Sequence, residues 1–210
     1  ALEVLMLELT TAALVPLLIS SVTAALVSYA LMGQFSVYDF HVTEMFHMGN
    51  IPFYILLGVL AGFISLSFTR IYNFVEDTFD KVKTWYAKLM LGVAILGVLL
   101  FFLPSLYGEG YDVVSSSLKG DYSELFKNSM FYGYRENGVA IILMFVAGIF
   151  FKSIATSVTF GAGGIGGIFA PTLFIGANTG LFLGEILRYF GYGSVKSSNF
   201  ALIGMCGLIA

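Results

Sequence analysis

Runs of about twenty apolar residues recur along this sequence, and they constrain its fold more than any other feature. A helix needs roughly twenty apolar residues to cross the hydrocarbon core of a bilayer. Hydrophobic residues make up 58% of the chain and charged residues only 11%, which is outside the usual range of soluble domains. We therefore expect an all-α integral membrane protein that crosses the bilayer several times.

The positions of the apolar runs predict one transmembrane domain over residues 1–210. Long helices are expected at about 10–32, 50–75, 85–103, 138–160 and 169–190, and a further helix should start at about 200. The polar stretch from Ser105 to Asn137 should hold short helical or re-entrant pieces. The chain begins and stops inside apolar runs, so we expect it to be a fragment of a longer protein.

The distribution of charge predicts the topology, because short cytoplasmic loops carry an excess of lysine and arginine. The connection after the second span holds three lysines, whereas residues 34–50 hold two acids and no lysine or arginine. We expect residues 34–50 and 105–137 to face outward and the lysine-rich connection to face the cytoplasm. The net charge of −3 argues against a nucleic-acid partner.

A glycine-rich segment lies between the last two long spans. Five of the seven residues from Gly161 to Gly167 are glycine, so this backbone can take positive φ and admit an ion close to its N–H groups. Ile168, Phe169, Ala170 and Pro171 then open a helix, and the start of a helix carries unpaired N–H donors and a partial positive charge. Irregular backbone at membrane depth must be buried in protein or line a cavity. The segment therefore predicts an anion site.

The segment has two other interpretations. A phosphate-binding loop is disfavoured because no Gly-Lys-Ser/Thr follows the glycines. A structural hinge between two packed helices stays open. Gly176, Gly180 and Gly184 continue at four-residue spacing, and this spacing predicts a packing face of the downstream helix rather than part of the site.

These residues resemble the CLC family of chloride channels and chloride/proton exchangers. Gly166 to Pro171 matches the family's G-x-F-x-P signature, residues 152–161 look like the helix that leads into it, and Gly108 to Tyr111 resembles its glycine-rich turn. The resemblance implies a CLC-type inverted-repeat bundle with tilted and re-entrant helices, present here in part. It also implies that the backbone N–H groups of Ile168 and Phe169 bind chloride, with Gly166, Gly167, Ala170 and Pro171 forming the loop and helix start.

The same resemblance implies a homodimer in a bacterial inner membrane or another cell membrane, with an interface through residues of about 12–32 and 50–70. No cofactor is implied, because chloride is the transported ligand and protons are a second one in exchangers. The family's coordinating serine, gating glutamate and coordinating tyrosine belong to segments outside this sequence. The opening Leu2-Glu3-Val4 resembles the family's (F)-x-x-E segment. Exchangers often have a second acid directly after that glutamate, where this chain has Val4, so channel and exchanger both remain open.

Charged and metal-ligating residues add little else. Lys152 lies inside an apolar span, where it could raise the local potential for anions or extend to the interface. Glu3 has two interpretations. It could belong to a proton path, or its carboxylate could be bonded to a helix end near the interface. His41 and His47 lie near Glu44, but this set is too sparse for a metal site. No catalytic constellation is present, so we do not expect an enzyme. The rival to anion transport is a helix-packing module of a different transporter.

Overall fold

The computed structural model describes residues 11–33, 48–192 and 195–209, and these divide into two units. The first unit contains α2 (Thr11–Met32), an apolar helix that includes Pro16. The described side chains of α2, such as Val15 and Leu26, are exposed within that unit. Glu3, Val4, His41, Glu44 and His47 lie outside the described residues, so the expectations placed on them remain predictions.

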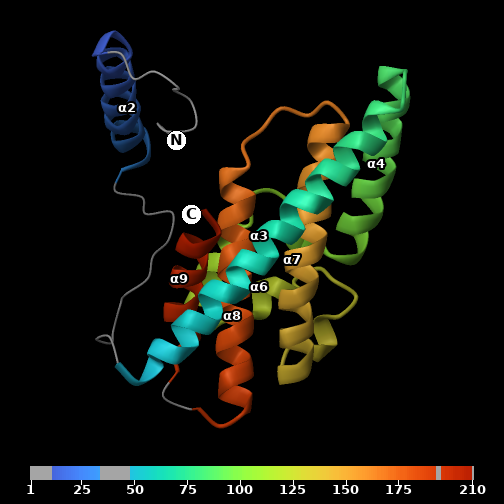
Figure 1. Ribbon diagram of the computed structural model, residues 1–210. Helices are drawn as coiled ribbons and strands as arrows, with labels where there is room; N and C mark the ends of the chain where they lie inside the picture. The colour runs from blue at the N-terminus through green and yellow to red at the C-terminus, as the bar shows by residue number, and fades with distance from the viewer. Residues whose placement is uncertain (1–10, 34–47, 193–194, 210) are drawn as a thin grey trace. The chain divides into compact units, whose positions relative to one another are not determined.

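The second unit is built from helices alone in its described part (Figure 1). Its long helices are α3 (Ile51–Asp80), α4 (Trp85–Phe102), α7 (Gly138–Gly161) and α8 (Phe169–Tyr189), followed by α9 (Ser197–Ile209). Each of the first four is long and apolar enough to cross a membrane. The bounds of these four helices lie within five residues of the limits expected from the apolar runs.

The helix α3 extends five residues beyond its predicted end at about 75. The prediction ended where the acidic residues begin, but Glu76, Asp77 and Asp80 are tolerated in a helix that continues past the hydrocarbon core. Where Pro104 follows α4, the chain turns into the short helix η2 (Pro104–Leu106), as the missing proline N–H requires.

Short helices fill the polar stretch between α4 and α7, as expected. They are α5 (Tyr111–Leu118), α6 (Ser123–Phe126) and η3 (Tyr132–Tyr134), and η1 (Met48–Asn50) leads into α3 in the same way. The helix α7 then begins at a side-chain cap, because Asn137 Oδ1 accepts a hydrogen bond of 3.0 Å from the Val139 N–H.

The centre of the unit is α8, which packs against α9, α7 and α5. Phe174, Ile175, Ala177 and Leu181 of α8 are each at most 1% exposed. By contrast, Gly92 is the one buried residue of α4. Figure 1 shows α3 lying obliquely across α7 and α8, and contacts join it to both helices. The core therefore fixes α8, whereas α4 presents most of its apolar side chains outward.

Glycines allow α9 to approach α8 at backbone contact. A Cβ at Gly176 would lie 2.5 Å from the Gly204 carbonyl oxygen, and one at Gly184 would lie 2.8 Å from Ser197 Cα. A Cβ at Gly180 would overlap the backbone of Phe200. The prediction of a packing face is confirmed, and this face holds α8 rigidly in place.

Candidate functional site

The loop between α7 and α8 closes the first helix with ordinary hydrogen bonds. The N–H of Gly163 donates to Phe160 O and that of Gly164 donates to Thr159 O, both at 2.9 Å. Gly163, at φ +95°, is the one residue of 161–167 with positive φ. A Cβ at Gly164 would lie 2.7 Å from Thr159 O. Conformation therefore requires glycine at Gly163, and close packing requires it at Gly164.

The first turn of α8 leaves backbone donors unused. Ile168 already has helical dihedrals, φ −80° and ψ −19°, and its carbonyl accepts the Thr172 N–H at 3.0 Å. Among the described residues, the N–H groups of Ile168, Phe169 and Ala170 have no acceptor. Pro171 has no N–H to satisfy. Three donors are thus available at the positive end of a 21-residue helix.

A cavity of about 530 Å³ lies at this helix start. It brings together most of the predicted site residues, although they come from separate parts of the chain. Its wall includes Gly166, Gly167, Phe169, Ala170 and Pro171 from the loop and α8, Lys152, Thr156 and Thr159 from α7, and Gly108 and Glu109 from the turn before α5. Ile168 is absent from this wall. The loop is not buried in the described chain, since Ile165 is fully exposed and Phe169 is 63% exposed.

Lys152 points into the protein and does not extend to the interface. The residue is 3% exposed. Its Nζ donates to the carbonyl oxygens of Leu106 at 3.0 Å and Gly108 at 2.6 Å, and it lies 5.1 Å from the centre of the Phe174 ring. Two of the three ammonium N–H bonds are therefore used to hold the turn before α5. The positive charge remains beside the cavity.

The turn that Lys152 holds depends on two glycines. Gly108 and Gly110 have φ of +65° and +84°, which side chains with a Cβ rarely adopt. Gly110 also lies directly against the Phe174 ring, where a Cβ would overlap it. Glu109, between them, is exposed and contributes a carboxylate to the cavity wall. The glycine-rich turn noticed in the sequence is thus a part of the same site.

Sequence reasoning missed a buried carboxylate at the other end of α8. Glu185 is 9% exposed, and its Oε1 accepts hydrogen bonds from Tyr122 Oη at 2.6 Å and Ser197 Oγ at 2.8 Å. Arg188 Nη1 lies 3.3 Å from the same oxygen. These contacts join α8 to α6 and α9. The rule that drew attention to Lys152, an ionisable residue inside an apolar span, could have identified Glu185 as well.

We predict that Tyr122→Phe lowers the stability of the protein by about 1–2 kcal/mol at neutral pH, because the buried carboxylate loses a donor. Burial, and then the neighbouring Glu185, raise the pKa of Tyr122 above its ordinary value of 10.0. The folded state therefore keeps a proton that the unfolded chain releases above about pH 10, so stability falls as pH rises through that range. Thermal unfolding from pH 7 to 11 should show a steeper alkaline loss for the wild type than for the variant. Parallel curves would contradict the prediction.

Comparison with known proteins identifies the family. The sequence model described as voltage gated chloride channel matches residues 1–210. The voltage-gated ClC-type chloride channel ClcB of Salmonella typhimurium is 30% identical over 211 residues, covering 98% of this chain and 45% of that protein. The ClcB-like putative chloride channel protein of Ralstonia nicotianae is 30% identical, covering 99% and 45%.

ClcB of Escherichia coli O17:K52:H18 is 31% identical, covering 99% of this chain and 46% of its own length. The chain therefore spans about half the length of the curated relatives it matches. The match covers the G-x-F-x-P loop, the glycine turn beside it and the apolar helices around both. The chain belongs to the voltage gated chloride channel family, also called CLC.

Proposed function

We propose that the protein moves chloride and similar monovalent anions across a membrane, and that the N–H groups at the start of α8 bind the anion in transit. The proposal rests on the backbone N–H groups of Ile168, Phe169 and Ala170, which have no acceptor among the described residues and lie at a helix start beside a cavity. A helix start has roughly half a positive charge, and that charge acts most strongly on an anion held away from water.

The charges of the site support moderate rather than very tight binding. The Lys152 ammonium is engaged with two carbonyl oxygens, and Glu109 places a negative charge on the same wall. An anion in the cavity is therefore attracted by backbone dipoles and by one shared cation. Transport requires binding that is strong enough to replace hydration but weak enough to permit release.

The relatives are about twice as long as this chain. The loop residues from Gly163 to Phe169 are exposed in the described chain. We propose that the rest of the longer protein covers this loop and completes the anion pathway. This cover would exclude water, which makes the helix dipole more effective.

Replacing the amide N–H of Phe169 with an ester oxygen should weaken chloride binding by the full-length protein about tenfold or more. A hydrogen bond to a charged group contributes roughly 1.5–3 kcal/mol, and each 1.4 kcal/mol is tenfold in affinity. Phe182 provides a matched control, because it is a phenylalanine inside α8 whose N–H lies within the regular helix. Chloride titration calorimetry on both proteins checks the result. Equal effects at both positions would favour the hinge interpretation.

Channel and exchanger activity are separated by measuring chloride and proton flux together in liposomes. Chloride flux without proton movement identifies a channel, and a fixed ratio of protons to chloride identifies an exchanger. A flux that does not depend on the type of anion would instead support the packing-module alternative.

We further propose a homodimer through residues 12–32 and 50–70. The apolar side chains Ile55, Val59 and Phe63 of α3 are each more than half exposed. Gly58 and Gly62 lie between them, and a Cβ at either position would meet no described atom within 4 Å. Small residues beside exposed apolar ones are typical of contacts between membrane helices.

A further inference from the structure

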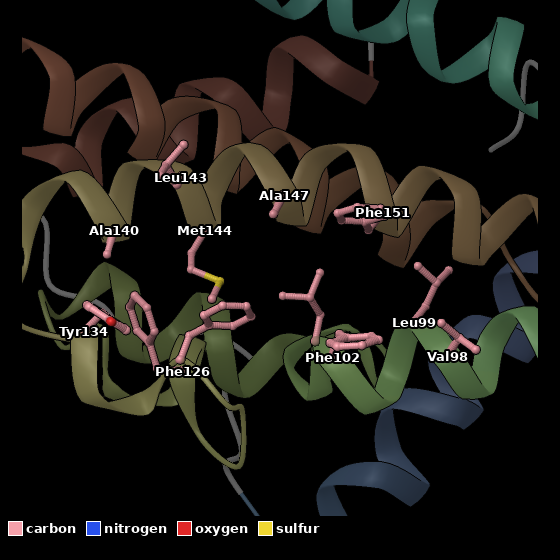
Figure 2. Close-up of a pocket in the computed structure, with 12 residues that line it drawn as sticks. Val98, Leu99, Phe102, Phe126, Tyr134, Ala140, Leu143, Met144, Ala147 and Phe151 are labelled. Carbon is pink, nitrogen blue, oxygen red and sulfur yellow. The ribbon is translucent and has the colours of Figure 1, made fainter.

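A second cavity, separate from the candidate anion site, lies between α4 and α7. Its volume is about 610 Å³. Figure 2 shows Phe102 and Leu99 of α4 on one side, Met144, Ala147 and Phe151 of α7 on the other, and Phe126 near one end. We call this cavity the α4–α7 crevice. It shares no lining residue with the anion cavity.

The chemistry of the crevice suits a hydrocarbon. All of its lining side chains are apolar except Tyr134, which carries a hydroxyl. Both walls belong to helices that are apolar enough to cross a membrane, and Val98, Leu143 and Phe102 are 60%, 62% and 47% exposed. In a bilayer the medium around such a surface is acyl chains. An unfilled apolar gap forfeits dispersion contacts, so a chain that fills it is favoured.

The length of the crevice fits one leaflet. Its α7 wall extends from Ala140 to Phe151, a rise of about 16 Å at roughly 1.5 Å per residue. The hydrocarbon core of a bilayer is about 30 Å thick, so one leaflet is about 15 Å deep. A single acyl chain from one leaflet can therefore occupy the crevice over its whole length.

A cationic residue, Arg135, directly follows Tyr134, which lines one end of the crevice, just before α7 begins. The Arg135 guanidinium lies 4.5 Å from the centre of the Tyr132 ring. Among the described residues its one ion-pair partner is Glu136, at 3.7 Å, and that side chain is 89% exposed. Such an exposed ion pair contributes little to stability. Most of the five guanidinium N–H bonds of Arg135 remain available to bind another group. Arginine binds phosphate oxygens in a bidentate manner, and aromatic and basic residues at a helix end are typical of headgroup depth.

We propose that the α4–α7 crevice binds one acyl chain of a phospholipid whose phosphate is bound by Arg135. The apolar lining and the length of one leaflet favour an acyl chain. The guanidinium of Arg135, the residue after Tyr134, favours a phosphate. The phospholipid acts here as a specific ligand rather than as bulk solvent.

The proposal is tested on the full-length protein in nanodiscs with phosphatidylglycerol that carries a photoactivatable diazirine in one acyl chain. Adducts should map to crevice residues such as Met144 and Phe102. Ala147→Trp, which fills the crevice, should lower the yield at those residues about tenfold. Val139→Trp changes an exposed α7 residue outside the crevice and should leave the yield unchanged.

Arg135→Ala separates phosphate binding from simple contact with lipid, and it changes an exposed side chain. It should lower crevice labelling by phosphatidylglycerol about tenfold, as expected for the loss of a charged hydrogen bond. Labelling by a diazirine-carrying diacylglycerol, which has no phosphate, should not change. If exposed Met90 of α4 is labelled and the crevice residues are not, another segment of the protein covers the crevice. That result, or equal labelling of all apolar surfaces, would overturn the proposal.

Discussion

Gly180→Ala is expected to destabilise the protein by about 3 kcal/mol or more, because the added methyl group would overlap the backbone of α9. The atoms that it meets are Phe200 C and O and Ala201 Cα, and these cannot move aside as the end of a flexible side chain can. The two helices would have to separate, which would also disturb the contacts at Gly176 and Gly184.

Thermal unfolding in detergent, together with the yield of monodisperse protein, checks this prediction. Gly97→Ala is the matched control, since a Cβ at Gly97 in α4 meets no described atom within 4 Å. Alanine there should change stability little or raise it slightly, because it favours helix more than glycine does. If the two variants unfold at the same temperature, α8 and α9 do not pack as described.

Lys152→Met is expected to cost about 2–3 kcal/mol of stability and to weaken chloride binding. Methionine fills similar space, but the carbonyl oxygens of Leu106 and Gly108 lose their shared donor. The buried Leu106 carbonyl, left unsatisfied, costs about 1–3 kcal/mol, and the carbonyl of the exposed Gly108 costs less. The turn that carries Glu109 would be released from α7, and the cavity would lose the cation at its wall.

Lys88→Met provides the comparison for a lysine without such a role. Lys88 pairs with Asp80 at 3.1 Å, and the aspartate side chain is 73% exposed, so its loss should cost under about 1 kcal/mol. Unfolding curves and chloride titrations of both variants show whether Lys152 holds the turn and assists the anion. A Lys152→Met protein with wild-type stability and wild-type affinity would show that the ammonium neither holds the turn nor assists the anion.

The sequence predicted the spans well because each is set by local composition. Apolar length defines α4, α7 and α8 almost to the residue, and Pro104 marks the end of α4. The end of α3 was less predictable, since the apolar signal stops before the helix does. The packing role of Gly176, Gly180 and Gly184 followed from their spacing, because residues four apart share one face of a helix.

The geometry of the site was predictable only in part. The G-x-F-x-P segment indicated a helix start with free donors, and those donors are present among the described residues. The contact of Lys152 with Leu106 joins residues 46 positions apart, and no local pattern specifies such a pair. The contacts of Glu185 with Tyr122 and Ser197 likewise join residues 63 and 12 positions apart. Long-range side-chain contacts depend on how helices pack, which composition and periodicity do not determine.

The most direct measurement of the central claim is an anomalous diffraction map from crystals of the full-length protein grown in bromide. The account predicts a bromide peak within hydrogen-bonding distance of the backbone nitrogens at the start of α8, including that of Phe169. The claim is contradicted if those nitrogens donate instead to carbonyl oxygens from the rest of the protein and no bromide lies before them.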